Sequence, residues 1–242
     1  MNIYGGRAGL NSVRFIGEKY QALARFKNGE ITTETRRKKG TRKIFTTLSK
    51  IPFVRAFSLL FEFIIDYWKI YLVVFTGLLL MESSLIGSSN ASFLHAIQIN
   101  ALVMLLSFFV IAGLFMKITP IAKYHAAEHM AASAYDEDPD LTLEKVKKQP
   151  RTHKNCGTNL VIPVSACFCI LFFAFGDALW VFLVSWSIGY EIWRGEPKII
   201  WGAVLAIGKV AQYYLFTSKP EEKHLMVAIE ALRGLEEKEN EN

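Results

Sequence analysis

The sequence contains few cysteines and lacks an apolar segment at its start. Three cysteines among 242 residues, two of them in one apolar run, do not form a disulfide framework. The first 20 residues lack the apolar core of a signal peptide, so we expect the N-terminus to stay in the cytoplasm. We find no phosphate-binding loop, dinucleotide-binding fingerprint or internal repeat. The common nucleotide-binding and repeat architectures therefore receive no support.

Apolar side chains, in contrast, are abundant. Hydrophobic residues make up 52% of the chain and aromatic residues 13%, and the mean hydropathy is +0.24. The formal net charge is nevertheless +6. The aromatic content argues against disorder, and charges segregated from long apolar stretches are typical of integral membrane proteins. We therefore predict a mainly α-helical protein that crosses the membrane several times.

The positive charge is concentrated in the N-terminal part. Residues 1–55 contain 13 Lys and Arg but three acidic residues, whereas the rest of the chain has a net charge of −4. A basic segment ahead of the first membrane helix fits the positive-inside rule, and it also favours contact with anionic lipid. Nucleic-acid binding is the alternative for such a cluster, but we expect no nucleic-acid partner. The N-terminus is thus predicted to face the cytoplasm of a multi-pass cell-membrane protein.

Three consecutive parts are expected along the chain. Residues 1–50 form a basic cytoplasmic module with a small β-hairpin, because Asn28-Gly29 separates two alternating runs and both residues tolerate positive φ. Residues 51–216 form the transmembrane helical domain, including a cytoplasmic helix and loop at 119–157. Residues 217–242 form a C-terminal amphipathic helix and an acidic tail.

About four membrane spans are predicted. They are a long helix over roughly 56–81 with a charged side, then 97–116, 155–176 and a short span over 178–193. Residues 199–216 are apolar, but Lys209 and Gln212 interrupt them, so we expect this segment to lie in the interface or to re-enter. A fifth span is the alternative.

The most specific motif is the HAAEH sequence, which runs from His125 to His129 on a helix expected over 120–134. Residues four apart lie on one face of a helix, so the two imidazoles can bind one metal ion. This is the H-x-x-E-H order of the inverzincins, in which the histidines bind zinc and the glutamate is the general base. We therefore predict that His125 and His129 bind metal and that Glu128 is catalytic. A pair of exposed helix histidines is the alternative.

A second ligand pair follows at His153 and Cys156. A histidine and a cysteine three apart before Gly157 suit a turn that offers two ligands, and zinc or another divalent transition metal accepts both. A closed set of three histidines and this cysteine would be structural, whereas an open position would be catalytic. Glu191 is a further candidate ligand or supporting residue, although pairing with Arg194 would explain it equally well.

Residues 123–160, KYHAAEHMAASAYDEDPDLTLEKVKKQPRTHKNCGTNL, resemble the core signature of the bacterial YqhQ-like membrane proteins. That family has no assigned function and is usually described as predicted metal-dependent enzymes, so the resemblance implies a metal site in a membrane setting. It extends to Gly5-Gly6, 188–191, Gln212, Thr217 and Pro220. The chain departs from the family pattern where Arg7 replaces Gln, Asn11 replaces Glu and Met130 replaces Lys. The resemblance therefore supports the site and the membrane setting more than any reaction.

Together, these features predict an integral membrane metalloprotein, with zinc-dependent hydrolysis of a membrane-associated lipid or peptide as the candidate activity. The alternative is a non-enzymatic membrane scaffold or regulator with a structural metal site. A transporter has less support, because the spans hold few ionisable groups and no inverted repeat is visible.

Overall fold

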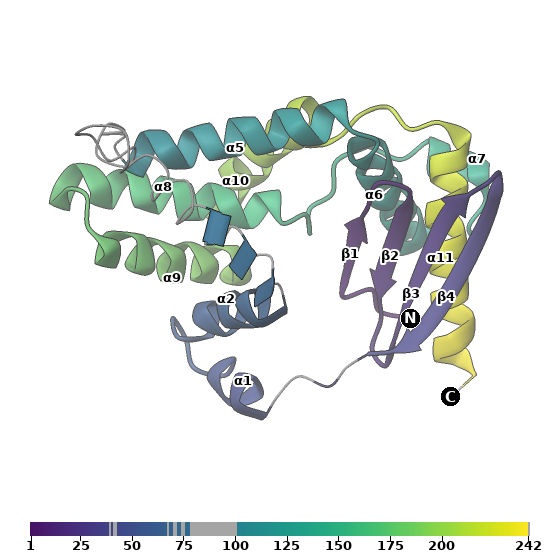
Figure 1. Ribbon diagram of the computed structural model, residues 1–242, viewed down its shortest axis with the longest axis horizontal. Coiled ribbons are helices and arrows are strands. Elements are labelled where there is room, and N and C mark those ends of the chain that lie inside the picture. Colours follow the sequence, from purple (N-terminus) through teal and green to yellow (C-terminus); the bar gives the residue numbers. More distant parts are fainter. Residues whose placement is uncertain are drawn as a thin grey trace. The chain divides into compact units, whose positions relative to one another are not determined.

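The computed structural model describes residues 1–38, 40, 43–66, 68–69, 72–73, 76–77 and 101–241. The chain forms two compact units (Figure 1), and each draws on segments that are distant in the sequence. The first unit comprises Met1–Gly40, Phe108–Ile162 and Glu196–Asn242, and the second comprises Thr41–Ser107 and Pro163–Gly195. These units cut across the three consecutive parts that we expected.

A four-stranded antiparallel sheet lies in the first unit. Asn28 (φ 53°) and Gly29 (φ 87°) form the two-residue turn of its last hairpin, which confirms the hairpin prediction. The first two strands were not expected, because they have only four and five residues and β1 begins with two glycines, which weaken a strand pattern. The strands pair in chain order: β1 (Gly5–Ala8), β2 (Ser12–Ile16), β3 (Tyr20–Lys27) and β4 (Glu30–Arg37).

One face of this sheet is buried. The strand register places Gly6, Phe15 and Ala22 in one cross-strand row, and such neighbours point to the same side. Phe15 and Ala22 have no exposed surface. Two helices cover this face: α6 (Ile121–Glu137) packs on β1 and β2, and α11 (Glu222–Asn240) packs on β2, β3 and β4. The core of the first unit lies between them.

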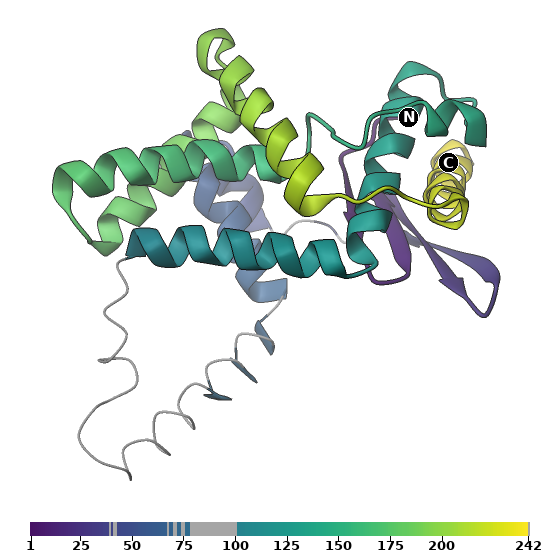
Figure 2. The same ribbon diagram turned by 90° about the horizontal axis from the view of Figure 1, so that it is seen from above.

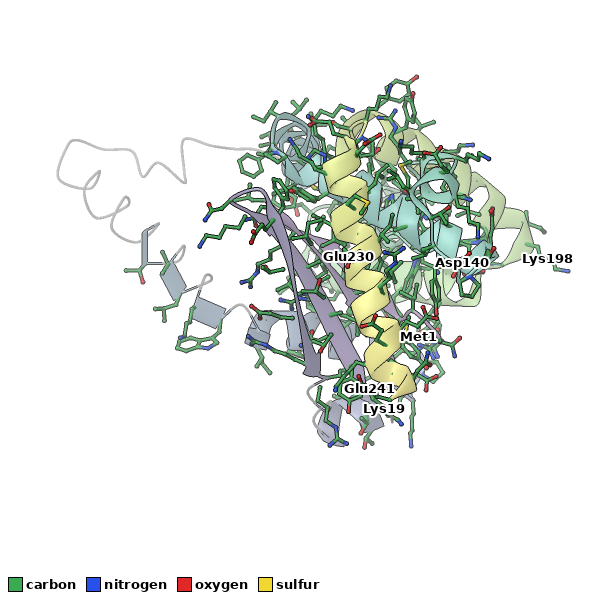
Figure 3. The ribbon with its side chains drawn as sticks, turned by 90° about the vertical axis from the view of Figure 1, so that its right-hand side faces the viewer. Met1, Lys19, Asp140, Lys198, Glu230 and Glu241 are labelled. Carbon is green, nitrogen blue, oxygen red and sulfur yellow. The ribbon has the colours of Figure 1, made fainter. Side chains whose placement is uncertain are left out.

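The C-terminal amphipathic helix is confirmed. Helix α11 runs along the sheet (Figure 3), and near its end the Glu239 carboxylate accepts hydrogen bonds from the main-chain N–H groups of Lys19 (2.8 Å) and Tyr20 (2.9 Å). Its helical spacing places the expected apolar side chains against the core. These buried residues are Leu225, Val227, Ala228, Ile229, Leu232 and Leu235. The two ends of the chain therefore share one core.

Helix α6 begins at a sharp bend. It follows α5 (Ala101–Ile118) at an angle of 88°, measured from Leu106 onward. The Thr119 hydroxyl donates to the Met116 carbonyl at 2.9 Å, and Pro120 occupies the N-cap position of α6 without a side-chain cap. Proline lacks an N–H and cannot continue α5, which explains the break. The polar segment after α6 contains the short helix α7 (Leu143–Lys147).

Within the described residues, two helices are long and apolar enough to cross a membrane, or up to three if the bent pair is one span. They are α8 (Thr158–Phe175) and the stretch Lys198–Phe216, which joins α10 (Lys198–Ala211) to the π-helical turn η1 (Gln212–Phe216). The segment that we expected in the interface is thus a continuous helix of spanning length. The lone Gln212 does not interrupt it, because its amide is satisfied by partners described below.

The other predicted spans are only partly described. Helix α2 (Arg55–Asp66) covers the start of the expected 56–81 helix, and residues 78–81 lie outside the described residues. Residues 97–100 of the second expected span also lie outside them. The fourth expected span is α9 (Leu179–Gly195), which has 17 residues. A span count of four remains a prediction.

The second unit is held together by close helix packing. Helices α8 and α9 follow each other across Gly176 (φ 81°) and lie side by side (Figures 1 and 2). Gly189 of α9 lies against Val164, where an added Cβ would be 2.5 Å from the Val164 Cα. The short helix α1 (Lys43–Leu48) packs on α2 in the same unit.

Candidate metal centre

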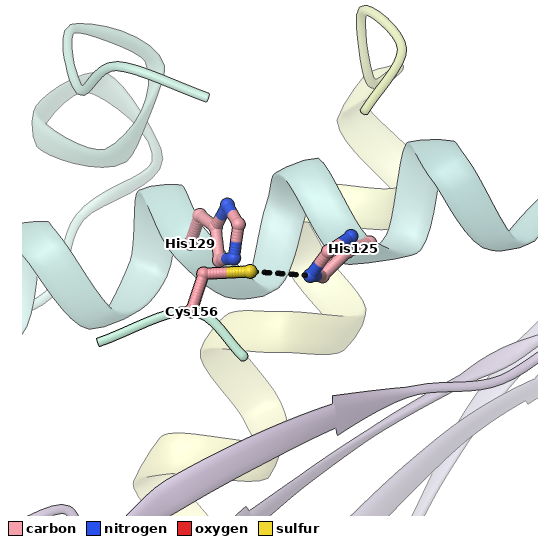
Figure 4. A group of neighbouring side chains, drawn as sticks. All are labelled: His125, His129 and Cys156. Carbon is pink, nitrogen blue, oxygen red and sulfur yellow. Dashed lines mark hydrogen bonds between the residues drawn. The ribbon is translucent and has the colours of Figure 1, made fainter. Parts of the chain in front are cut away.

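Three potential ligand atoms converge in the first unit (Figure 4). They belong to His125 and His129 of α6 and to Cys156 in the loop before α8, and they lie within 4.8 Å of one another. The Cys156 Sγ is 3.6 Å from Nε2 of His125, and the two imidazole centroids are 4.3 Å apart. The one-turn spacing of the histidines therefore places both rings on the face of α6 that meets the cysteine.

A main-chain carbonyl orients each of these histidines. The Nδ1 of His125 is 3.0 Å from the Phe216 carbonyl oxygen, and the Nδ1 of His129 is 2.8 Å from the Arg151 carbonyl oxygen. Since a carbonyl oxygen can only accept, we assign the proton of each ring to Nδ1. When the ring is neutral, which is the form that binds metal, each Nε2 offers a lone pair toward the shared centre. Metal-ligating histidines are commonly held in this way.

Cys156 is buried, with 8% of its surface exposed. Burial raises the pKa of its thiol, but the His129 imidazole and the Thr158 hydroxyl, whose oxygen is 3.4 Å from Sγ, favour the thiolate. The balance places the pKa of Cys156 below its usual value. A thiolate is the form that binds metal, so the surroundings of Cys156 suit a ligand.

Glu128 lies beside the three ligands. Its carboxylate oxygen is 3.7 Å from Nε2 of His129, and burial raises the pKa of Glu128 to about 7, partly opposed by the charge of His125. Gly6 of β1 leaves the room that this side chain occupies, because a Cβ at Gly6 would be 1.9 Å from Oε1 of Glu128. A carboxyl group with a pKa near 7 suits proton transfer at neutral pH.

His153 is adjacent to the centre but is not one of the converging ligands. Its ring stacks on His129 with centroids 5.9 Å apart, its Nδ1 accepts from the Asn155 N–H at 3.3 Å, and its Nε2 is 3.8 Å from an Asp136 oxygen. Burial lowers the pKa of His153 to about 4, with His129 acting in the same direction. Of the second predicted ligand pair, His153 and Cys156, the described geometry therefore brings Cys156 into the group with His125 and His129.

The π-helical turn η1 supports both halves of the centre. Its Phe216 carbonyl orients His125, and its buried Gln212 accepts from the His153 N–H at 2.8 Å. The Gln212 amide also donates to the His153 carbonyl at 3.2 Å and to the Asn159 side chain at 3.3 Å. Sequence reasoning missed this role. The available signal was a single glutamine within an apolar run, where a buried amide needs partners.

Glu191 has a different partner in the second unit. The Arg55 guanidinium donates to both of its carboxylate oxygens, with Nε to Oε1 at 2.8 Å, and the Phe53 N–H donates to Oε1 at 2.9 Å. We had considered pairing with Arg194, but Arg55 is the residue that binds it directly. Glu191 does not belong to the group formed by His125, His129 and Cys156.

Comparison with known proteins supports the resemblance seen in the motifs. A family model described as "Protein of unknown function (DUF1385)" matches residues 56–238. The "Uncharacterized protein YqhQ" of Bacillus subtilis (strain 168) is 26% identical over 137 residues. That stretch covers 50% of this chain and 43% of the relative, so the match spans less than half of the relative's length. No solved structure matches the chain.

Proposed function

Because the chain belongs to the DUF1385 family, whose description assigns no activity, we propose a function from the metal centre itself: an integral membrane metalloprotein that hydrolyses a membrane-associated substrate. One observation carries the proposal. Two carbonyl-oriented imidazoles and a buried cysteine converge within 4.8 Å, with Glu128 beside them. Two imidazoles and a thiolate suit zinc or another divalent transition metal.

Each residue has a specific role in this proposal. His125 and His129 would hold the metal through Nε2 and Cys156 would hold it through Sγ, a set of three protein ligands like those of catalytic zinc sites. A zinc ion held there would supply a water activated for attack near neutral pH. Glu128 would be the general base, since its carboxylate oxygen lies 3.7 Å from Nε2 of His129 and burial raises its pKa to about 7.

We further propose that the centre lies at the cytoplasmic membrane surface. Cys156 precedes the first residue of α8 by two positions, and Phe216, which orients His125, is the last residue of the other span-length helix. Both apolar helices thus end beside the ligands. The basic residues 1–55 favour a cytoplasmic N-terminus and contact with anionic lipid.

Metal analysis of the purified full chain tests this proposal. We expect about one zinc or similar ion per chain in the unaltered protein, and only traces in His125→Ala. His224→Gln is the matched control, because it removes a buried histidine that is not in the ligand group and should leave metal content unchanged. Trace metal in the unaltered protein, or equal metal in His125→Ala, would overturn the proposal.

A structural metal site is the second candidate. It is favoured by the position of His153, whose ring stacks on His129 and which would close the site if the ring turned inward. The variant His153→Ala distinguishes a catalytic metal site from a structural one. A catalytic site held by three ligands should keep its metal in this variant, whereas a closed structural site should lose metal affinity and thermal stability together. Glu128→Gln should abolish turnover only if the site is catalytic.

A further inference from the structure

The main chain of Arg151 contacts a candidate ligand, and its side chain contacts the turn η1. Its carbonyl oxygen accepts the hydrogen bond from His129 Nδ1 at 2.8 Å. Its guanidinium lies over the ring of Tyr213, 4.2 Å from the ring centroid. Tyr213 belongs to η1, the same turn whose Phe216 carbonyl orients His125. The side chain of Arg151 is therefore held against η1 by a cation–π contact.

A second cation contacts the same turn. The Lys117 ammonium, at the end of α5, donates to the Thr217 carbonyl at 2.7 Å and to the Tyr213 carbonyl at 3.3 Å. Within the described residues, no carboxylate forms an ion pair with either Lys117 or Arg151. A guanidinium stacked on an aromatic ring keeps its in-plane N–H donors for a planar or tetrahedral anion. Two cations without acidic partners thus share one tyrosine.

The surroundings of this pair match a membrane interface. Tyr213 and Tyr214 are 46% and 67% exposed, and they lie near the end of the span-length helix Lys198–Phe216. Tyrosine and basic side chains gather where apolar helices emerge into the headgroup region. At that level, the most abundant anion is the phosphate of a phospholipid.

We propose that Arg151 and Lys117 bind the phosphate of a phospholipid headgroup, and that the metal centre therefore takes an anionic phospholipid as its substrate. The substrate assignment rests on the hydrolase proposed above, whereas the binding step does not. A peptide substrate would not need two cations at this turn. The guanidinium supplies two parallel donors and the ammonium supplies a point charge, a combination that suits phosphate.

Lipid titration of the full chain in neutral detergent tests this assignment. The probes are dioctanoyl phosphatidylglycerol, dioctanoylglycerol with the same acyl chains but no phosphate, and inorganic phosphate, with binding followed by thermophoresis and metal content measured on the same samples. We expect Arg151→Ala to weaken phosphatidylglycerol binding about tenfold and Lys117→Ala to weaken it less. Arg151→Lys should restore only part of it, because an ammonium cannot form two parallel hydrogen bonds.

The control variant is Lys148→Ala, which changes the net charge equally but lies at the C-cap of α7, outside these contacts and outside the basic residues 1–55. Its phosphatidylglycerol affinity should match that of the unaltered protein. Binding unaffected by Arg151→Ala, or equal losses in Arg151→Ala and Lys148→Ala, would overturn the inference, as would equal affinity for dioctanoylglycerol or inorganic phosphate. If the purified protein contains no metal but still binds the lipid in a way that depends on Arg151, the proposal of a metal-dependent hydrolase is wrong and the proposal of a phosphate site stands.

Discussion

At the scale of single residues, the candidate centre depends on two kinds of feature. The spacing of its side chains can be read from the sequence, but the main-chain carbonyls that orient the histidines cannot. The pairing of His125 with His129 follows from helical periodicity, and Cys156 follows from its place in the next loop. Their orientation comes from main-chain oxygens of Arg151 and Phe216. Any residue type offers such an oxygen, so no pattern could predict these contacts.

The contact between Gly6 and Glu128 gives a prediction at this scale. Gly6→Ala should destabilise the protein by about 1–3 kcal/mol, because the new Cβ would overlap the Glu128 side chain. In a Glu128→Ala background the overlap is gone, and the loss should largely disappear. Chemical denaturation of the four proteins measures this coupling. Gly5→Ala is the control, since a Cβ there meets nothing within 4 Å. An equal loss in both backgrounds would contradict the contact.

At the scale of elements, prediction succeeded where local chemistry is strong. The β3–β4 hairpin has its Asn-Gly turn, and α11 has an apolar stripe over about three turns. Strands β1 and β2 form because α6 and α11 cover them, which is a tertiary effect that their own short sequences do not encode. The π-helical geometry of η1 could not be predicted from the local sequence either, because the Phe216 carbonyl and Gln212 bind partners from other elements.

The start of α11 gives a pH prediction. The buried His224 ring accepts a hydrogen bond from the Glu221 N–H at 3.1 Å and packs on Tyr124 with centroids 4.6 Å apart. Burial lowers the pKa of His224, and Lys223 and Lys123 act in the same direction, while Glu221 opposes them. The folded state therefore binds this proton less readily than the unfolded state. The contribution of the neutral His224 to the free energy of unfolding is therefore present above about pH 6.5, and it is lost as the pH falls below this value.

His224→Gln should remove this decline. Glutamine retains an acceptor for the Glu221 N–H, as in the usual capping box, but it does not titrate. We expect the unaltered protein to lose thermal stability relative to His224→Gln between pH 7.5 and pH 5. Other titrating groups are common to both proteins and cancel in the difference. A difference in melting temperature that stays constant with pH would exclude this role for His224.

At the scale of the whole molecule, the first unit joins both ends of the chain around α6. The expected division into consecutive parts rested on hydropathy, which separates apolar from polar segments but does not show which polar segments meet. The N-terminal sheet and α11 each have one apolar face, and the described structure pairs them. The ligand helix is therefore held by the first and last elements of the chain.

This arrangement predicts a coupled response to a core mutation. Leu232→Ala in α11, where the side chain is fully buried, should cost about 2–5 kcal/mol. Faster amide hydrogen exchange should then appear in β3 and α6 together, with little change in α9 of the second unit. Hydrogen exchange with mass spectrometry measures this, and Glu237→Ala on the exposed side of α11 serves as the control. Faster exchange confined to α11 would show that the elements are independent.

The position of η1 sets the order of events during biosynthesis. The histidines and the cysteine are synthesised before residue 157, but the carbonyl that orients His125 belongs to Phe216, some sixty residues later. While residues 212–216 are still inside the ribosome, the nascent chain contains His125, His129 and Cys156 but lacks the carbonyl that orients His125. The candidate centre is therefore completed only after the helix Lys198–Phe216 has been made, so any metal ion would bind late in synthesis.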